Sequence, residues 1–216
     1  MKVDKLRTVI IYIIIILLGL VCLLPLLNIV AISFSSSAAV EGNMVGLIPV
    51  GFSTAAYKKI LEDSQFWHSF LISVERVVLA LIINFVLIVL MAYPLSKTNA
   101  QFRGRNIYAN LMIFAMLFNG GMIPTFLVVK SYGLLNTVWA LVLPGAVPIF
   151  NVILVMNFFA AVPKELEEAA FIDGANPFQV LTKIFIPISK PVLATVSLFS
   201  IVGSWNDFYS GLIYMS

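Results

Sequence analysis

The segment EEAAFIDGANPFQVLTKIFIPISKP, residues 167–191, combines the residue types that most clearly predict a chemical role. It places three carboxylates, three alanines, a Gly and an Asn-Pro pair inside a chain that is 61% hydrophobic. Carboxylates can make charged contacts with another protein, and alanines let a second backbone come close. The chemistry that this spacing favours is recognition of a partner surface.

Residues for metal or nucleotide chemistry are scarce in the sequence. Cys22 is the only cysteine and His68 the only histidine, so neither an intrachain disulfide nor a His/Cys zinc site can form. No G-x-x-x-x-G-K-[ST] phosphate loop occurs. We therefore expect no metal, no cofactor and no enzymatic activity in this chain. If ATP is used, another chain binds it.

The composition predicts the elements that must position the polar segment. Charged residues make up 11% of the 216 residues, and the mean hydropathy is +1.05. One soluble core cannot enclose this much apolar surface, so the chain is predicted to be an integral membrane protein. Several stretches exceed the roughly 20 apolar residues that cross a bilayer as a helix, and they lack the alternation of a transmembrane barrel.

Five membrane spans are predicted, which makes the fold all-α and polytopic. The first follows MKVDKLR and is too long for the apolar part of a signal peptide, so it is expected to stay uncleaved. A short helix is expected from Thr54, and residues 1–216 are expected to form a single transmembrane domain. The predicted spans are residues 9–32, 70–95, 107–129, 138–159 and 191–213.

Basic residues predict the orientation in the membrane. The side with more Lys and Arg is normally cytoplasmic, and here nine fall on one side of the spans and three on the other. The nine are Lys2, Lys5, Arg7, Lys97, Arg103, Arg105, Lys164, Lys183 and Lys190, and the three are Lys58, Lys59 and Lys130. The N-terminus and the segment 161–187 are therefore expected to be cytoplasmic.

This cytoplasmic segment is predicted to form two short helices. Pro163 suits the first turn of a helix, and the acidic side chains after it favour the positive end of the helix dipole. Gly174 can take the left-handed conformation that ends this helix. Asn176 can cap a second helix, with Pro177 at its first position and Gln179 placed for the reciprocal contact. The two helices are expected to meet at the glycine.

One face of the first short helix is predicted to bind a soluble partner. Its members recur at helical spacing and are Leu166, Ala169, Ala170 and Asp173, with Glu168 beside them. The alanines leave room for another backbone. Because capping residues occur at most helix ends, an ordinary loop between two spans is the alternative.

Polar residues inside the predicted spans are candidates for a transport pathway. Asn206 and Asp207 lie in the outer part of the last span, where they could line the pathway, form its outer gate or pack at the interface. Asn84 could line the pathway or form a hydrogen bond between helices. Glu75 and Arg76 are predicted to snorkel or to form an ion pair, with each other or with a neighbouring helix.

Gly120, Gly121 and Pro124 interrupt the third predicted span and are candidates for a hinge, with a static packing notch as the alternative. No series of Asp, Glu or His crosses the predicted bilayer, as a proton-driven carrier would usually need. A carrier or channel that works without ATP is therefore the weaker hypothesis, as is a membrane scaffold that does not transport.

The spacing in the cytoplasmic segment resembles the EAA motif of ABC importer permeases, E-A-A-x3-G-x9-I-x-L-P. The matching residues are Glu168, Ala169, Ala170, Gly174, Ile184 and Pro187, with Ile186 at the Leu position. The chain resembles the binding-protein-dependent sugar permeases, the family of the maltose permease MalG and of the LplC-like permeases. Further similar stretches are LIPVGFSTAAY, AYPLSK, FRGRN, FNGGMIPTFLVV and SWNDF.

This resemblance implies a type I importer permease fold of the MetI-like kind, whose core has six spans. The sequence is therefore expected to be truncated before the sixth. The resemblance also implies that residues 161–187 are a coupling loop that sits in a cleft of a cytoplasmic ATPase subunit. Its coupling positions are Glu167, Glu168, Ala169, Ala170, Asp173, Gly174, Ala175, Ile184 and Pro187.

The function that the resemblance implies is solute import in a bacterial plasma membrane. The chain would be the permease subunit of an ABC importer for a sugar or oligosaccharide. Its expected partners are the lipid bilayer, a second permease, two ATPase subunits that hold ATP and Mg, and an extracellular or periplasmic binding protein, with no nucleic acid. A permease for a non-sugar solute is the alternative, because the groups that hold a sugar leave no spaced motif.

Overall fold

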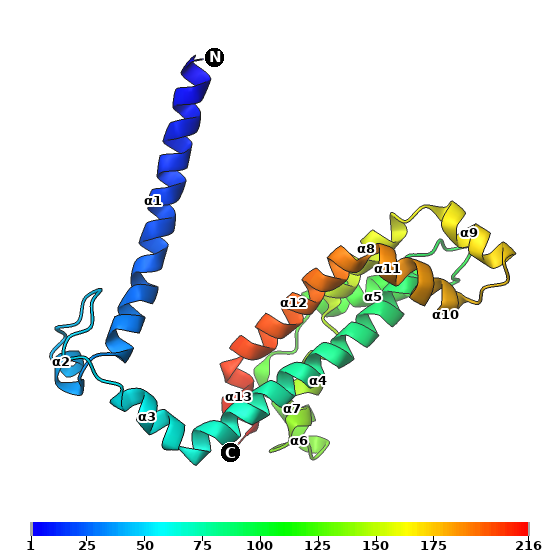
Figure 1. The fold of residues 1–216 in the computed structure, drawn as a ribbon. Coiled ribbons are helices and arrows are strands. Elements are labelled where there is room, and N and C mark those ends of the chain that lie inside the picture. Colours follow the sequence, from blue (N-terminus) through cyan, green and yellow to red (C-terminus); the bar gives the residue numbers. More distant parts are fainter. Residues whose placement is uncertain (1, 216) are drawn as a thin grey trace. The chain divides into compact units, whose positions relative to one another are not determined.

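The computed structural model describes residues 2–215, with side chains from Arg7 onward, as helices joined by loops. Its contacts divide the chain into two compact units, Met1–Ser69 and Phe70–Ser216, and each is described by itself. Figure 1 labels the helices in chain order. One helix, α4 (Ser64–Leu95), begins in the first unit and continues through the second.

The first unit consists of a long apolar helix and a short segment packed at its end. α1 (Lys2–Ser33) is followed by α2 (Ser37–Glu41) and α3 (Ala55–Glu62). Nearly all apolar side chains of α1 are exposed, with Ala31 buried near its end. This is typical of a helix that lies in lipid, and Arg7–Ser33 is long enough to span a membrane. The predicted short helix is confirmed, since Thr54 is the N-cap of α3.

Polar and aromatic contacts hold this short segment against the end of α1. The Asn28 amide donates to the carbonyl oxygen of Gly46 at 2.7 Å. Ser33 Oγ lies 2.8 Å from Tyr57 Oη, and the ring centroids of Phe34 and Tyr57 are 5.0 Å apart. The segment between the first two long helices is therefore ordered by contacts with the helix that precedes it.

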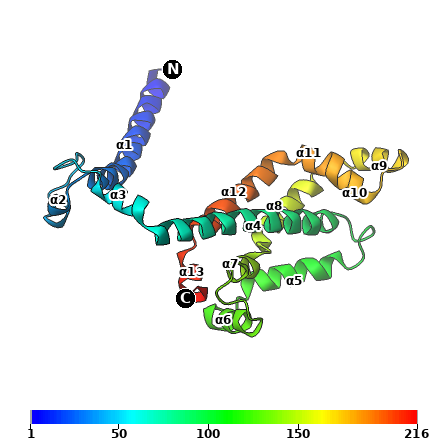
Figure 2. The same cartoon turned by 60° about the horizontal axis from the view of Figure 1, so that its bottom comes forward.

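The second unit is a bundle in which α4, α8 and α12 lie side by side (Figures 1 and 2). The side chains of Ala92, Val152, Val155 and Val180 have no exposed surface in its core. Its other helices, in chain order, are α5 (Arg105–Leu117), α6 (Met122–Ser131), α7 (Val138–Val142), η1 (Leu143–Gly145), α8 (Ile149–Ala160), α9 (Lys164–Ile172), α10 (Pro177–Val180), η2 (Leu181–Phe185), α11 (Ile186–Ile188), α12 (Lys190–Asn206) and α13 (Phe208–Tyr214).

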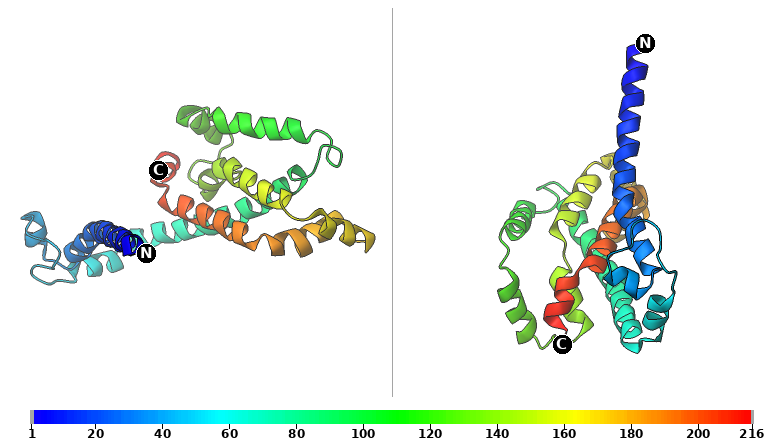
Figure 3. Two further views of the ribbon diagram at one scale, coloured as in Figure 1. Left: turned by 90° about the horizontal axis from the view of Figure 1, so that it is seen from above. Right: turned by 90° about the vertical axis from the view of Figure 1, so that its left-hand side faces the viewer.

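None of the last three predicted spans is a single straight helix. α5 and α6 meet at 112° (Figure 3), and α7 with η1 meets α8 at 48°. The last predicted span consists of α12 and α13, separated at Asp207, and α12 itself meets the preceding helices at 84°. Among the described residues, two helices can cross a membrane by length and composition, or up to five spans result if each bent pair counts as one.

Local chemistry explains these breaks. Gly121 has a φ of +85°, which no helix allows, and it begins α6 as its N-cap. Pro148 cannot donate a helical hydrogen bond and disfavours the helical conformation at the residue before it. The Asp207 side chain accepts a hydrogen bond from the Ser210 N–H at 3.1 Å and so starts α13 as a new helix.

Candidate functional site

The coupling segment, residues 161–187, begins with α9 (Lys164–Ile172). Two glutamates lie in its first turn, as the helix dipole favours, and Pro163 precedes the helix as its N-cap instead of occupying the first turn. Gly174 ends α9 with a φ of +81°. There the Ala175 N–H donates to the carbonyl oxygen of Ala170 at 2.9 Å. The predicted helix and its glycine stop are confirmed.

The second short helix, α10 (Pro177–Val180), begins with the predicted capping box. The Gln179 N–H donates to Asn176 Oδ1, and the Asn176 N–H donates to Gln179 Oε1, both at 2.9 Å. α10 continues into the π-helical turn η2, a rare conformation that is frequent at functional sites. In Figure 1, α9 and α10 form one end of the second unit and α13 lies at the other end.

The predicted coupling residues divide between two sides of the segment. Ala170, Ala175 and Ile184 pack against the core of the bundle, so Ala170 does not share the exposed face with Ala169 as the helical spacing predicted. Large apolar side chains are exposed nearby, with Ile172 at 86% and Phe178 at 65%. The exposed predicted residues are Glu168, Ala169, Asp173, Gly174 and Pro187.

Glu167 faces the bundle and forms a buried ion pair. Lys97 Nζ lies 2.7 Å from Glu167 Oε2, and Tyr93 Oη lies 3.4 Å from Oε1. The Lys97 ammonium is also 4.1 Å from the ring centroids of both Tyr93 and Phe185. Burial lowers the pKa of Lys97, and the Glu167 carboxylate opposes this shift by stabilising the charged form.

This ion pair joins the coupling segment to the end of α4, across 70 positions of the chain. Sequence reasoning missed it and grouped Glu167 with the exposed Glu168. One feature of the sequence could have indicated the pair: Lys97 comes just after a long apolar span. A cation that is buried there needs an anion beside it. The adjoining pocket is small, about 70 Å³.

Two of the predicted pathway residues, Asn84 and Asp207, border one cavity of about 400 Å³. Arg76 lies there as well: its guanidinium donates to the carbonyl oxygen of Asp207 at 2.9 Å and pairs with the Asp207 carboxylate. The Asn84 amide is 3.3 Å from Ser200 Oγ, which links α4 to α12. Asn206 is exposed, and its amide donates to a carbonyl oxygen within its own helix.

Nearly the whole chain matches a known family. Residues 2–216 match the family described as binding-protein-dependent transport system inner membrane component. The chain belongs to this family. Its members are permease subunits of ABC transporters and not enzymes, since the ATPase is a separate subunit.

The permease is similar to two proteins of Bacillus subtilis (strain 168). It is 45% identical to Protein LplC over 92% of this chain and 66% of LplC. It is 41% identical to the polygalacturonan/rhamnogalacturonan transport system permease protein YtcP, over 99% of this chain and 74% of YtcP. The chain therefore spans 66% of the length of LplC and 74% of that of YtcP.

A solved structure has the same fold as the permease. It is the crystal structure of a bacterial ABC transporter involved in the import of the acidic polysaccharide alginate. The match has a TM-score of 0.91 at 34% identity and covers 100% of this chain and 76% of that chain. The predicted all-α, MetI-like permease fold is confirmed by this likeness and by the family match.

The residues predicted as a hinge lie at the sharp turn of the permease between α5 and α6. The Gly121 N–H donates to Asn119 Oδ1 at 2.9 Å, which stabilises the turn. A Cβ on Gly120 would lie 3.7 Å from Pro124, an ordinary contact. The predicted interruption of the third span is confirmed, and movement at this turn stays a prediction.

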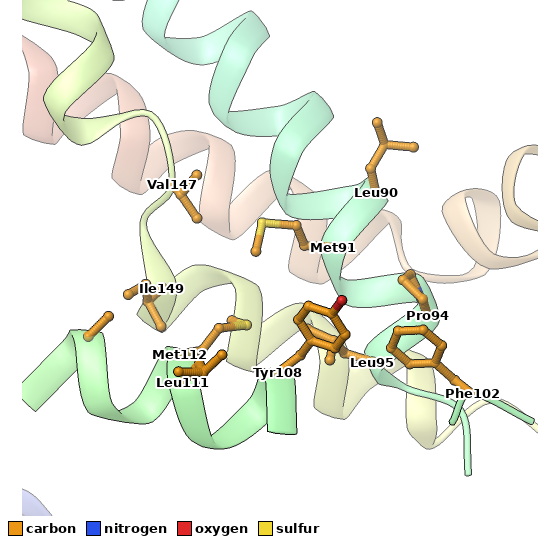
Figure 4. A pocket seen from close by; sticks show the side chains of 11 residues that line it. Leu90, Met91, Pro94, Leu95, Phe102, Tyr108, Leu111, Met112, Val147 and Ile149 are labelled. Carbon is orange, nitrogen blue, oxygen red and sulfur yellow. The ribbon is translucent and has the colours of Figure 1, made fainter. Parts of the chain in front are cut away.

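Another pocket of the permease, about 470 Å³, lies between α4 and α5 (Figure 4). Met91 and Pro94 line it from α4, and Leu111 and Met112 line it from α5. Among the described residues of its lining, Tyr108 contributes the only side-chain oxygen or nitrogen. The lining thus differs from that of the cavity at Arg76, which contains many hydrogen-bonding groups.

Proposed function

We propose that this chain is the permease subunit of a bacterial ABC importer that carries a sugar or oligosaccharide. It pairs with a second permease and receives its substrate from a binding protein outside the cell. Two ATPase subunits, which hold ATP and Mg²⁺, drive it. The observation that carries the proposal is the geometry of α9 and α10, two angled helices that meet at Gly174, expose Glu168 and are joined to α4 through Glu167.

The names of the relatives support a carbohydrate substrate. YtcP is named for transport of polygalacturonan/rhamnogalacturonan, and the solved relative is involved in alginate import. Both names refer to long carbohydrates. An oligosaccharide is therefore the substrate class proposed for this chain, with a different solute as the alternative.

The basic residues support a cytoplasmic coupling segment. Nine of them fall on the side of the N-terminus and of residues 161–187, against three on the other side. An ATPase bound there would bury Ile172 and Phe178, which are large and exposed. Glu168 is exposed beside them and would add a charged contact that fixes the orientation of the partner.

Coupling in this proposal is mechanical. ATP would close the ATPase dimer and carry the coupling segments of the two permeases toward each other. The Lys97–Glu167 ion pair would prevent α9 from moving independently of α4, because its separation would leave two charges buried without partners. The turn into α12 would pass the same displacement to the helix that borders the cavity at Arg76.

Gly174→Val in the assembled transporter tests this function. Valine is strongly disfavoured at a φ of +81°, while no atom lies within 4 Å of the place that a Cβ would take, so the strain falls on the angle between α9 and α10. We expect normal insertion and assembly with transport per ATP hydrolysed reduced roughly tenfold or more. The measurement is sugar uptake and ATP hydrolysis in proteoliposomes.

Gly133→Val is the matched control, because Gly133 also has a positive φ, +66°, and empty space around a Cβ, but lies after α6. Gly174→Asn should keep coupling, since Asn tolerates the left-handed conformation. Normal coupling by Gly174→Val, or an equal loss by Gly133→Val, would contradict the proposal. Uptake driven by an ion gradient without an ATPase would favour a carrier instead.

A further inference from the structure

Polar side chains of three helices face the cavity of about 400 Å³ in the second unit. Arg76 and Asn84 come from α4, and Ser200 and Ser204 come from α12. Within each helix these residues are four or eight positions apart, so they lie on one face. Asn151 of α8, only 6% exposed, adds a buried amide. The cavity is therefore polar on several sides, although it is partly open to the surface of the bundle.

Small residues keep this cavity open. Gly145 and Gly203 both line it, and a Cβ built on either would have no atom within 4 Å. Ala80 lies between the two polar residues of α4 and is almost fully buried. A larger side chain at either glycine would fill the space without meeting the backbone of another helix. The volume lies within the range of small-molecule pockets, about 300 to 1,000 Å³.

Arg76 keeps N–H groups that make no hydrogen bond with the described residues. Its terminal nitrogens are engaged by Asp207, but Nε is buried and has no hydrogen-bond partner among the described residues. The whole residue is 7% exposed. The two terminal nitrogens carry four N–H groups, and each nitrogen makes one contact with Asp207, so further N–H groups of Arg76 are available to a ligand in the adjoining cavity.

The charges of the lining cancel. Arg76 and Asp207 are the only ionisable residues among the described ones that border the cavity, and they pair with each other. The remaining groups are amides and hydroxyls, each able to donate and accept a hydrogen bond. The hydroxyl groups of a sugar ring need this mixture, whereas a carboxylate entering the cavity would meet the charge of Asp207.

We propose that this cavity binds an uncharged, hydroxyl-rich glycosyl unit of the transported carbohydrate, with Arg76, Asn84 and Ser204 as hydrogen-bonding residues. The inference rests on the proposed transport function and adds to it a binding site and a preference for uncharged sugars. The apolar pocket of Figure 4 offers no comparable set of groups, since its lining has a single side-chain hydroxyl among the described residues.

The test is sugar binding to the purified transporter, without its binding protein. The probes are three neutral disaccharides (α-1,4-galactobiose, maltose and cellobiose) and α-1,4-digalacturonate, which differs from the first by its carboxylates. We expect at least one neutral disaccharide to bind roughly tenfold or more tightly than digalacturonate, since one buried hydrogen-bonding mismatch is worth about this much. Digalacturonate as the tightest ligand, or no binding of any neutral probe, would overturn the proposal.

Gly203→Leu should weaken binding of that neutral disaccharide roughly tenfold or more, because the new side chain fills the cavity. Ala194→Leu is the matched control on the same helix, exposed and away from the cavity, and should bind as the unaltered protein does. Unchanged binding by Gly203→Leu would overturn the proposed site.

Asp207→Asn tests the charge argument, because Asn can still cap α13 while Arg76 loses its counter-charge. The affinity for digalacturonate should rise relative to the affinity for the neutral disaccharide. An unchanged ratio of these two affinities would contradict the proposed preference for uncharged sugars. ATP hydrolysis stimulated by the binding protein is measured on the same samples. If the binding protein does not stimulate ATP hydrolysis by the unaltered transporter, the proposed function fails. If it does, and Gly203→Leu still binds the disaccharide as the unaltered protein does, only the cavity proposal fails.

Discussion

Two ion pairs involving α4 and the residues after it differ in what surrounds them. Lys97 pairs with Glu167, both side chains are 12% exposed, and two aromatic rings flank the ammonium. Arg76 pairs with Asp207 beside a cavity of about 400 Å³, and its Nε has no hydrogen-bond partner in the part of the chain that the structure describes. Both pairs join the α4 region to a segment far along the chain, but only the first is enclosed by side chains.

Similar ion pairs can serve two roles, depending on what surrounds them. The two charges of an enclosed pair have no other partners available, so separating them costs free energy. The two segments that carry the charges therefore move together. A pair beside a cavity can keep its contact and still offer a donor to a ligand. We therefore assign transmission of movement to the Lys97–Glu167 pair and contact with the solute to the region of Arg76.

Glu167→Ala should give the largest loss of stability, because it leaves the Lys97 charge buried without a partner. We expect a cost of about 3 kcal/mol or more, measured by thermal unfolding of the purified protein in lipid nanodiscs. Replacing both Lys97 and Glu167 with Met should recover most of the lost stability. The control is Glu62→Ala in the exposed Lys58–Glu62 pair, 3.8 Å apart, which should change nothing measurable. Equal losses of stability in the two alanine variants would show that the enclosed pair stabilises the protein no more than the exposed pair does.

Asp207→Ala should have a smaller effect than Glu167→Ala. It removes the partner of Arg76 and the cap of α13, but the Asp207 side chain is 33% exposed and the cavity lies beside Arg76. We expect a cost of about 1 to 2 kcal/mol, mostly from the lost cap and pair, in the same unfolding measurement. A cost as large as that of Glu167→Ala would show that the second pair is as enclosed as the first.

Tyr93→Phe should have the smallest effect and sharpens the account of the enclosed pair. Phenylalanine keeps the ring beside Lys97 and loses only a hydroxyl that lies 3.4 Å from Glu167, a long hydrogen bond. We expect a cost below about 0.5 kcal/mol. Tyr93→Leu, which removes the ring, should cost about 1 kcal/mol more. Equal unfolding temperatures for the two variants would show that the ring does not stabilise the ammonium.

The chemistry of the coupling segment could be predicted from the sequence because it is local. Asn176 and Gln179 cap α10 through groups three residues apart, and Gly174 ends α9 through its own backbone angle. Residue type and spacing contain all the information that such contacts need. Hydropathy likewise predicted the apolar stretches, since each is defined by its own composition.

The long-range contacts could not be predicted in the same way. Glu167 and Glu168 are adjacent and chemically identical, and only the packing of α9 on α4 decides which one is buried. An ion pair of Arg76 with a neighbouring helix was among the expected alternatives, but the sequence did not identify Asp207 as its partner. The breaks in the spans were underestimated because Gly and Pro are tolerated within membrane helices, so their presence does not fix an angle.

In the proposed function, the coupling segment transmits the state of an ATPase to the permease. Cysteine cross-linking in membranes tests it most directly, from Ala169→Cys in a Cys22→Ser background to cysteines in the co-expressed ATPase, with and without ATP and the binding protein. Ala169 is exposed on α9, so its replacement leaves the buried ion pair intact. We expect a cross-link whose yield changes with nucleotide. The absence of a cross-link in correctly inserted protein, or a yield that ignores nucleotide, would contradict it.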